Sequence, residues 1–164
     1  MTLDHDTARV AAGVRGDAAW EPGIATGEPS LVSKVVRLNL LVTRALEDVT
    51  TKLGISLADH LVLGVLRRSP DEHATPTRIC EVLRRTTGGM TLTIDRLEKA
   101  GWITRSADPT DRRRILVTLT DAGRDLAIAV NEELHRWEDH LGLPSRSRER
   151  IDTALDALLL LFDH

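Results

Sequence analysis

Apolar side chains recur at intervals of three and four residues along most of the chain, a spacing typical of helices with one buried face. Ser30, Ser56 and the pair Thr75-Pro76 stand where helices start, since Ser and Thr cap helix N-termini and proline fits the first turn. The pattern predicts six helices, at residues 30–53, 56–69, 75–83, 88–100, 121–141 and 145–162. A weaker pattern at 3–20 predicts a short helix, followed by a linker rich in glycine and proline.

Two short runs, 102–105 and 115–119, are rich in the residues that favour strands. A turn sequence at 107–111 and three consecutive arginines at 112–114 separate them, which predicts a β-hairpin with a basic tip. Two short helices joined by a tight turn and followed by such a hairpin indicate a winged helix-turn-helix. The predicted fold is therefore mainly α with a small β-hairpin wing.

The last helix carries more apolar residues than one buried face needs, with leucines at 155 and 158–161 followed by Phe162. A helix that is apolar all round must be buried, and a single protomer offers too few neighbours to bury it. We therefore predict a homodimer. The expected organisation is an N-terminal extension (1–29) and a domain (30–164), in which helices 30–53 and 121–163 form a dimerisation platform and residues 56–120 form the winged helix-turn-helix.

Charge is placed unevenly along a chain whose net charge is -3. Residues 67–114 hold eleven basic and seven acidic residues, whereas the remainder holds 11 and 18. A basic centre on an acidic scaffold favours a polyanionic partner, although a solvated charged surface explains the charge equally well. One cysteine excludes a disulfide framework. No long apolar run marks a signal peptide or a membrane span, so a cytoplasmic protein is expected.

The start of the second short helix is the part expected to meet DNA, because the N-terminal residues of a recognition helix lie nearest the base edges. Glycines there let the backbone approach closely, and threonines offer hydroxyls to phosphates and methyls to thymine. The alternative for the two glycines is a plain loop before the helix. The predicted contacts are Thr86, Thr87, Gly88, Gly89 and Thr91, with Arg96 further along the helix.

The basic hairpin tip is expected to enter the minor groove, where arginine responds to the narrow width and negative potential of A·T-rich DNA. Its residues are Arg112, Arg113 and Arg114, and Asp111 stands where its carboxylate can hold the Arg113 side chain extended. The alternative is a solvated basic loop. Its position beside a helix-turn-helix favours the DNA contact.

The stretch 108–124, DPTDRRRILVTLTDAGR, resembles the wing signature of MarR-family transcriptional regulators, and so does the stretch 90–103. The resemblance covers about 30–162. It implies an obligate homodimer that binds a pseudo-palindromic DNA site, usually as a repressor relieved by a small molecule, with Arg113 as the minor-groove arginine and Asp111 as its partner. Many members carry arginine at position 92 or 93, where this chain has Leu92 and Thr93. A urate-type response is therefore disfavoured.

A small-molecule effector is expected in a crevice between the platform helices and the winged module. Its walls would be apolar with few polar groups, which suits a small, largely apolar ligand such as an aromatic carboxylate. The predicted lining is Trp20, Leu38, Val42, His60, Leu61, Gly64 and Trp137. The alternatives are a regulator whose crevice is filled by side chains and has no effector, or one that acts through protein contacts.

Enzyme chemistry is not indicated. The sequence has no nucleophile elbow, phosphate loop or metalloprotease motif. Cys80 stands inside an apolar helix stretch and is interpreted as a small buried residue. His135 and His140 are five residues apart, a poor spacing for one helical face, so no metal is predicted. No cofactor is expected either, and double-stranded DNA is the expected macromolecular partner.

Overall fold

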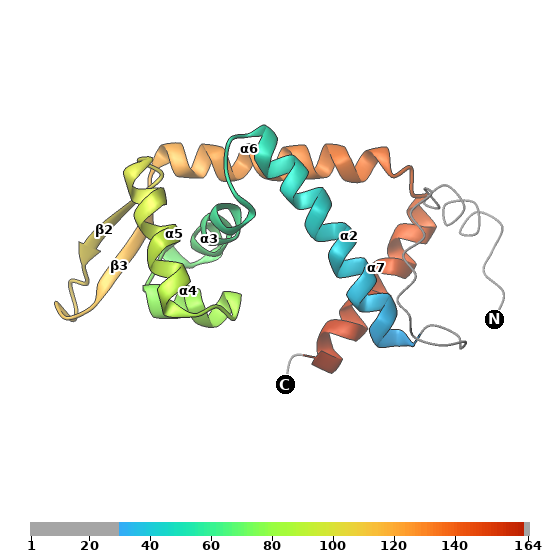
Figure 1. The fold of residues 1–164 in the computed structure, drawn as a ribbon, viewed down its shortest axis with the longest axis horizontal. Coiled ribbons are helices and arrows are strands. Elements are labelled where there is room, and N and C mark those ends of the chain that lie inside the picture. Colours follow the sequence, from blue (N-terminus) through green and yellow to red (C-terminus); the bar gives the residue numbers. More distant parts are fainter. Residues whose placement is uncertain (1–29, 163–164) are drawn as a thin grey trace. The chain divides into compact units, whose positions relative to one another are not determined.

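The computed structural model describes residues 30–162, so Trp20 and the N-terminal extension lie outside the described residues. Helix α2 spans Leu31–Lys52, and the side chain of Ser30 accepts from the Ser33 N–H at its start. Helix α3 spans Leu57–Arg68 and begins with a complete capping box between Ser56 and Asp59. Both helices lie where the apolar spacing predicts them (Figure 1).

The helix-turn-helix consists of α4, Pro76–Leu83, and α5, Thr87–Lys99. The turn between them needs one left-handed residue, and Arg84 supplies it with φ 48°. Met90, Ile94 and Leu97 turn into the core, as the spacing predicts. Helix α5 begins one residue earlier than expected, at Thr87, and both glycines lie in its first turn.

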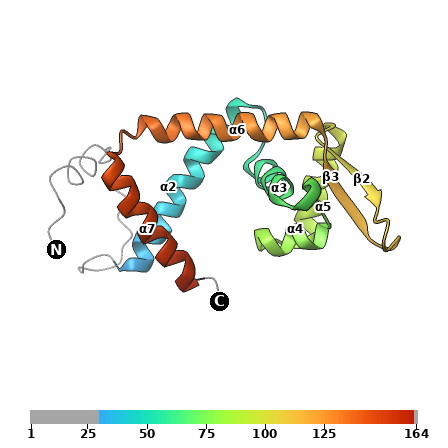
Figure 2. The ribbon, with the colours of Figure 1, turned by 180° about the vertical axis from the view of Figure 1, so that it is seen from behind.

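The wing strands are β2, Ile103–Ala107, and β3, Ile115–Leu119, which pair antiparallel from Ile103 opposite Leu119 to Ala107 opposite Ile115. A third strand, β1 (His73–Ala74), pairs with the other edge of β3. Strand β1 was not predicted, because two residues are too few to show an alternating pattern. The hairpin projects past α5, with its tip at the far end from α6 (Figure 2).

A short 3-10 turn, Pro70–Glu72, leads into β1 and is tied to the next long helix, α6 (Asp121–His140). The carboxylate of Glu72 accepts from Nε of Arg124 at 2.8 and 3.0 Å, and Asp121 accepts from the same guanidinium. These hydrogen bonds lower the pKa of Glu72. The ion pair holds the free edge of the sheet against the beginning of α6.

One hydrophobic core lies between α3, α4, α5 and the sheet, and its fully buried side chains include Leu63, Leu66, Ile79, Leu97 and Val117. The start of α6 fits closely against this unit. A Cβ placed on Gly123 would lie 2.0 Å from the carbonyl oxygen of Trp102, so only glycine fits there. Thr120 adds a hydrogen bond from its hydroxyl to the Gly101 carbonyl at 2.8 Å.

The chain divides into two compact units, of which the first is residues 30–135. In the second, the end of α6 is followed by α7, Ser145–Phe162, and Arg148 pairs with Glu138 and Asp139 at 3.7 and 3.8 Å. Ile151 and the five leucines of α7 are not buried.

Candidate nucleic-acid interface

The first turn of α5 is open to solvent. Thr86, Thr87, Gly88, Gly89 and Thr91 are all exposed. No side chain caps this helix at Thr86, whereas side chains cap α2, α3 and α4. A Cβ at Gly88 would meet nothing within 4 Å, so the surface above it is unobstructed. Free N–H groups at an exposed helix start favour an anionic partner such as phosphate.

The outward face of α5 holds one large apolar residue that the sequence analysis did not assign. Leu92 is 70% exposed and follows Thr91, whose hydroxyl donates to the Thr87 carbonyl at 3.0 Å. Thr93 is instead buried and donates to the Gly89 carbonyl. Leu92 therefore lies on the solvent-facing side of α5. Helical phase relative to Met90 and Ile94 was the signal that could have identified it.

The wing tip is shaped by two aspartates. The carboxylate of Asp108 accepts from both the backbone N–H and the hydroxyl of Thr110, at 2.8 and 2.7 Å, and these bonds lower its pKa. Asp111 accepts from the backbone N–H of Arg113 at 3.1 Å and pairs with the side chain of Arg114 at 3.4 Å. Asp111 thus holds the main chain of Arg113, whereas the expectation was that it would hold the Arg113 side chain.

The three wing arginines, Arg112, Arg113 and Arg114, are exposed. Arg113 and Arg114 also line an open basin of about 500 Å³ whose other wall is the start of α4, with Thr75, Thr77 and Arg78. This wall was not predicted, because only the fold brings residues 75–78 beside 113–115. The basin lies between the wing and the helix-turn-helix. Its lining holds three arginines and one acidic residue, Glu81, which pairs with Arg78 at 3.3 Å.

Arg96 and Arg105 each form ion pairs with acidic residues of another helix or strand. Arg96 donates to both carboxylate oxygens of Asp59 on α3, from Nε at 3.0 and 3.2 Å and from Nη2 at 2.7 Å. Arg105, on β2, pairs with Asp95 and with Glu98 on α5. The structure therefore places Arg96, a predicted DNA contact, in an ion pair inside the winged module.

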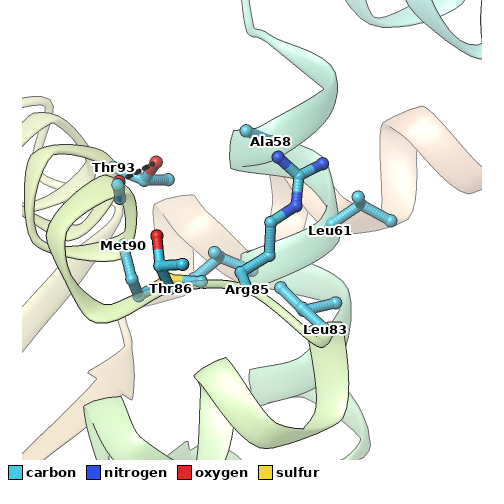
Figure 3. A pocket seen from close by; sticks show the side chains of 9 residues that line it. Ala58, Leu61, Leu83, Arg85, Thr86, Met90 and Thr93 are labelled. Atoms are coloured by element: carbon cyan, nitrogen blue, oxygen red, sulfur yellow. Dashed lines mark hydrogen bonds between the residues drawn. The ribbon is translucent and has the colours of Figure 1, made fainter.

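A small pocket lies behind the first turn of α5, on the side toward α3. It has a volume of about 130 Å³ and is lined by Ala58, Leu61, Val62, Leu83, Arg85, Thr86, Gly89, Met90 and Thr93. In Figure 3 the Arg85 side chain reaches from the turn between α4 and α5 toward Ala58. Arg85 is the one charged residue among those lining residues. The pocket walls are otherwise apolar or hydroxyl-bearing.

The predicted effector-site residues are not gathered around this pocket. Leu61 lines it, whereas Leu38 and Val42 are exposed on α2. Trp137 is exposed on the second unit, and Trp20 lies outside the described residues. His60 and Gly64 lie one turn apart on α3. Gly64 leaves room for the Arg68 guanidinium. A Cβ at position 64 would lie 3.2 Å from Nη2 of Arg68.

The His60 ring is half-buried, and its Nδ1 atom is enclosed without a hydrogen-bond partner among residues 30–162. Burial lowers the pKa of His60, and the nearby Arg68 charge lowers it further. The imidazole is thus held neutral at pH 7, so it does not supply a positive charge to an anionic ligand. Arg85 is better placed for that role.

Comparison with known proteins identifies the winged module. A model of the MarR family matches residues 53–114. The transcriptional regulator PecS of Dickeya dadantii (strain 3937) is 37% identical over 134 residues, which cover 80% of each chain. The chain belongs to the MarR family. Members of the MarR family are DNA-binding transcriptional regulators, so this protein is a regulator rather than an enzyme.

Solved MarR-family structures share the fold. Wild-type MarR from E. coli, in its apo form, superposes with a TM-score of 0.74 at 25% identity, covering 82% of this chain and 99% of that one. A mutant of MepR from S. aureus, solved bound to an oligodeoxyribonucleotide, gives a TM-score of 0.57 at 23% identity, over 79% and 96%. The winged helix-turn-helix and mainly α fold predicted from the sequence are confirmed.

The described residues offer no cluster of metal ligands and no single membrane-spanning helix. Among residues 30–162, no three His, Cys, Asp or Glu side chains gather to hold a metal ion. No single helix in this range is long and apolar enough to cross a membrane, and the pair α2 and α3 passes that test only together, with an 88° bend between them.

Proposed function

We propose that the protein is a homodimeric repressor that binds a pseudo-palindromic DNA site through its two winged helices and leaves it when a small ligand binds. The observation that carries the DNA-binding part is the pairing of an open, uncapped α5 start with an arginine-rich wing on the same unit. Helix α5 would enter the major groove with its first turn at the base edges. In a dimer the half-sites would lie about 10 bp apart, centre to centre.

Within this interface the residues have separate roles. Thr87, Thr91 and Leu92 would read bases, and the exposed amides of the first turn would meet a phosphate. Arg112 and Arg113 would enter the adjacent minor groove. The basin between the wing and α4 would take the sugar-phosphate backbone that joins the two grooves, with Thr75, Arg78 and Arg114 around it.

The test uses duplexes that the wild-type protein enriches from a randomised pool. Arg113→Ala is expected to weaken binding to the selected duplex by roughly 1–3 kcal/mol, with the loss concentrated at an A·T-rich flank. Arg146→Ala removes another exposed arginine, from α7, and serves as the matched control. Fluorescence anisotropy titrations measure both. Equal affinities for Arg113→Ala and wild type would refute the wing assignment.

Dimerisation is supported by the apolar faces of the terminal helices. Helix α2 exposes Leu31, Val36, Leu40 and Leu41, and α7 exposes Leu155, Leu159, Leu160 and Leu161. Exposed apolar surface of this extent marks an association site in a folded protein. An obligate dimer would bury on the order of 2,000 Å² or more. Light scattering at micromolar concentration is expected to give twice the chain mass, and a folded monomer would refute the dimer.

The effector site we propose is the small pocket behind α5, here called the Arg85 pocket. Its volume of about 130 Å³ is below the ~300–1,000 Å³ of most ligand sites, so only a small molecule would fit. The Arg85 guanidinium would pair with a carboxylate, and the ring would lie against Leu61 and Met90. An occupant would press on Gly89 and so move the first turn of α5 relative to DNA.

The effector proposal is tested with benzoate and, as the neutral counterpart, benzyl alcohol. Benzoate is expected to raise the melting temperature of wild type and to release DNA, and Arg85→Gln is expected to abolish both effects. His60→Gln is the matched control, because His60 lies on the neighbouring helix α3 but outside the pocket lining. Stabilisation without release of DNA would favour a regulator that has no effector or acts through protein contacts.

A further inference from the structure

Arg96 of α5 and Asp59 of α3 form an ion pair that joins the two helices. We propose that Arg96 is a positioning residue, which sets the angle of α5 on α3 through this pair and does not contact DNA. The inference rests on the proposed role of the α5 start in reading bases. The pair would set the orientation of the first turn of α5.

The acceptor of this pair is almost completely enclosed. The Asp59 side chain is 3% exposed, whereas that of Arg96 is 51% exposed. Asp59 also accepts from the Ser56 backbone N–H at 3.0 Å and from the Ser56 hydroxyl at 2.7 Å, and Arg96 donates to that hydroxyl at 3.2 Å. Both carboxylate oxygens of Asp59 therefore accept hydrogen bonds. Among the described residues, the ion pair given for this buried charge is the one with Arg96.

The geometry favours a fixed orientation. A guanidinium that donates two parallel bonds to one carboxylate is restrained in direction as well as distance. Asp59 is itself immobilised, because it belongs to the capping box that starts α3. Moving Arg96 to a phosphate would leave a buried carboxylate without its counter-charge, which is strongly unfavourable. The pair therefore opposes a move of Arg96 to DNA.

Arg96 lies far along α5 from the first turn of the helix, so a small change at the Arg96–Asp59 pair can shift that turn. Ten residues separate Arg96 from Thr86, which at 1.5 Å a residue is about 15 Å. A small tilt about this contact moves the first turn relative to the base edges, while the helix core of Met90, Ile94 and Leu97 stays buried. On the other flank, Arg105 joins α5 to the wing, but its partners Asp95 and Glu98 are well exposed. Exposed pairs contribute less.

The experiment compares Arg96→Gln, Asp59→Asn and the double variant with Arg112→Gln as the contact control. Each is titrated, at several salt concentrations, with the duplex enriched by wild type and with a scrambled duplex of equal composition. A residue that neutralises one phosphate lowers the slope of log affinity against log salt by about one. A positioning residue leaves that slope unchanged and lowers the preference for the selected duplex.

We expect Arg96→Gln and Asp59→Asn to lose a similar factor, roughly tenfold, on the selected duplex and little on the scrambled one. The double variant should bind the selected duplex about as tightly as the weaker-binding single variant, because each single substitution already removes the same contact. Arg112→Gln should lower the salt slope. The inference is overturned if Arg96→Gln lowers the slope while Asp59→Asn binds like wild type, or if neither substitution changes the preference.

A variant that fails to fold is recognised by circular dichroism, and Arg96→Lys then takes its place. Lysine keeps the charge but lacks the planar fork. A positioning role predicts lost preference with an unchanged slope, whereas a phosphate contact predicts binding like wild type. If the wild-type protein enriches no duplex from the pool, the proposed DNA-binding function is wrong. That outcome differs from every outcome named for the Arg96 and Asp59 variants.

Discussion

The winged module and the terminal helices handle their apolar residues in opposite ways. In the module, α3, α4, α5 and the sheet bury Leu63, Leu66 and Leu97 completely within one chain. Helix α2 buries only Val49 and Thr50, both near its C-terminal end, and α7 buries none of its leucines. The module therefore completes its own core, while the terminal helices carry apolar surface that a single chain leaves uncovered.

This difference assigns separate tasks to the two regions. A closed core keeps α5 and the wing in fixed positions relative to each other, as DNA reading requires. The exposed apolar faces of α2 and α7 are the surface through which we propose that two chains associate. Substitutions in the module should change stability within one chain, whereas substitutions in α2 or α7 should change self-association.

The largest effect is expected for the same substitution made in each region. Leu66→Ala leaves a cavity in a fully buried position and should lower the free energy of unfolding by about 2–5 kcal/mol. Leu160→Ala removes a side chain that is 76% exposed and should lower it by less than about 0.5 kcal/mol in the dissociated chain. Urea unfolding at low protein concentration measures both. Similar losses would show that the two regions do not differ.

A charge on the α7 face should affect association next most strongly. Leu160→Asp would place a carboxylate in the proposed interface and raise the dimer dissociation constant by roughly a hundredfold. Asp156→Asn, on the same helix, removes a charge and is the control for altered solubility. Analytical ultracentrifugation measures the constant. An unchanged constant for Leu160→Asp would place the interface away from this face.

A smaller effect is expected at the wing. Arg105→Gln removes the pairs with Asp95 and Glu98, which are partly exposed, and should lower the free energy of unfolding by about 0.2–1 kcal/mol. The loss should shrink at high salt, because screening weakens exposed pairs. Thermal melting at two salt concentrations measures it. A loss that salt does not change would indicate packing rather than charge.

The smallest effect is confined to acidic solution. Because burial holds the pKa of His60 below its ordinary value of 6.5, the unfolded chain takes up this proton first as the pH falls. Wild type should therefore lose stability relative to His60→Gln from about pH 7 downward, and the difference should level off once the folded protein is also protonated. Melting temperatures across this range measure it. A difference that does not vary with pH would exclude the titration of His60 as its cause.

Much of the module could be predicted because its signals are local. The capping box of Ser56 and Asp59, the Thr75-Pro76 start of α4 and the turn before the arginines each lie within a few residues, and each element formed where expected. Strand β1 could not be predicted in this way. Its two residues become a strand only because β3 supplies an edge to which they can pair.

The sequence by itself determined the family, the order of the helices and the exposed basic tip of the wing, since these depend on spacing and on residue type. Only the tertiary structure decided which arginines are already paired. Arg96 and Asp59 are 37 residues apart, and nothing local distinguishes Arg96 from Arg112. The packing of α5 on α3 brings a buried carboxylate within reach of one of them. Ion pairs across a fold depend on that packing, which a sequence pattern does not contain.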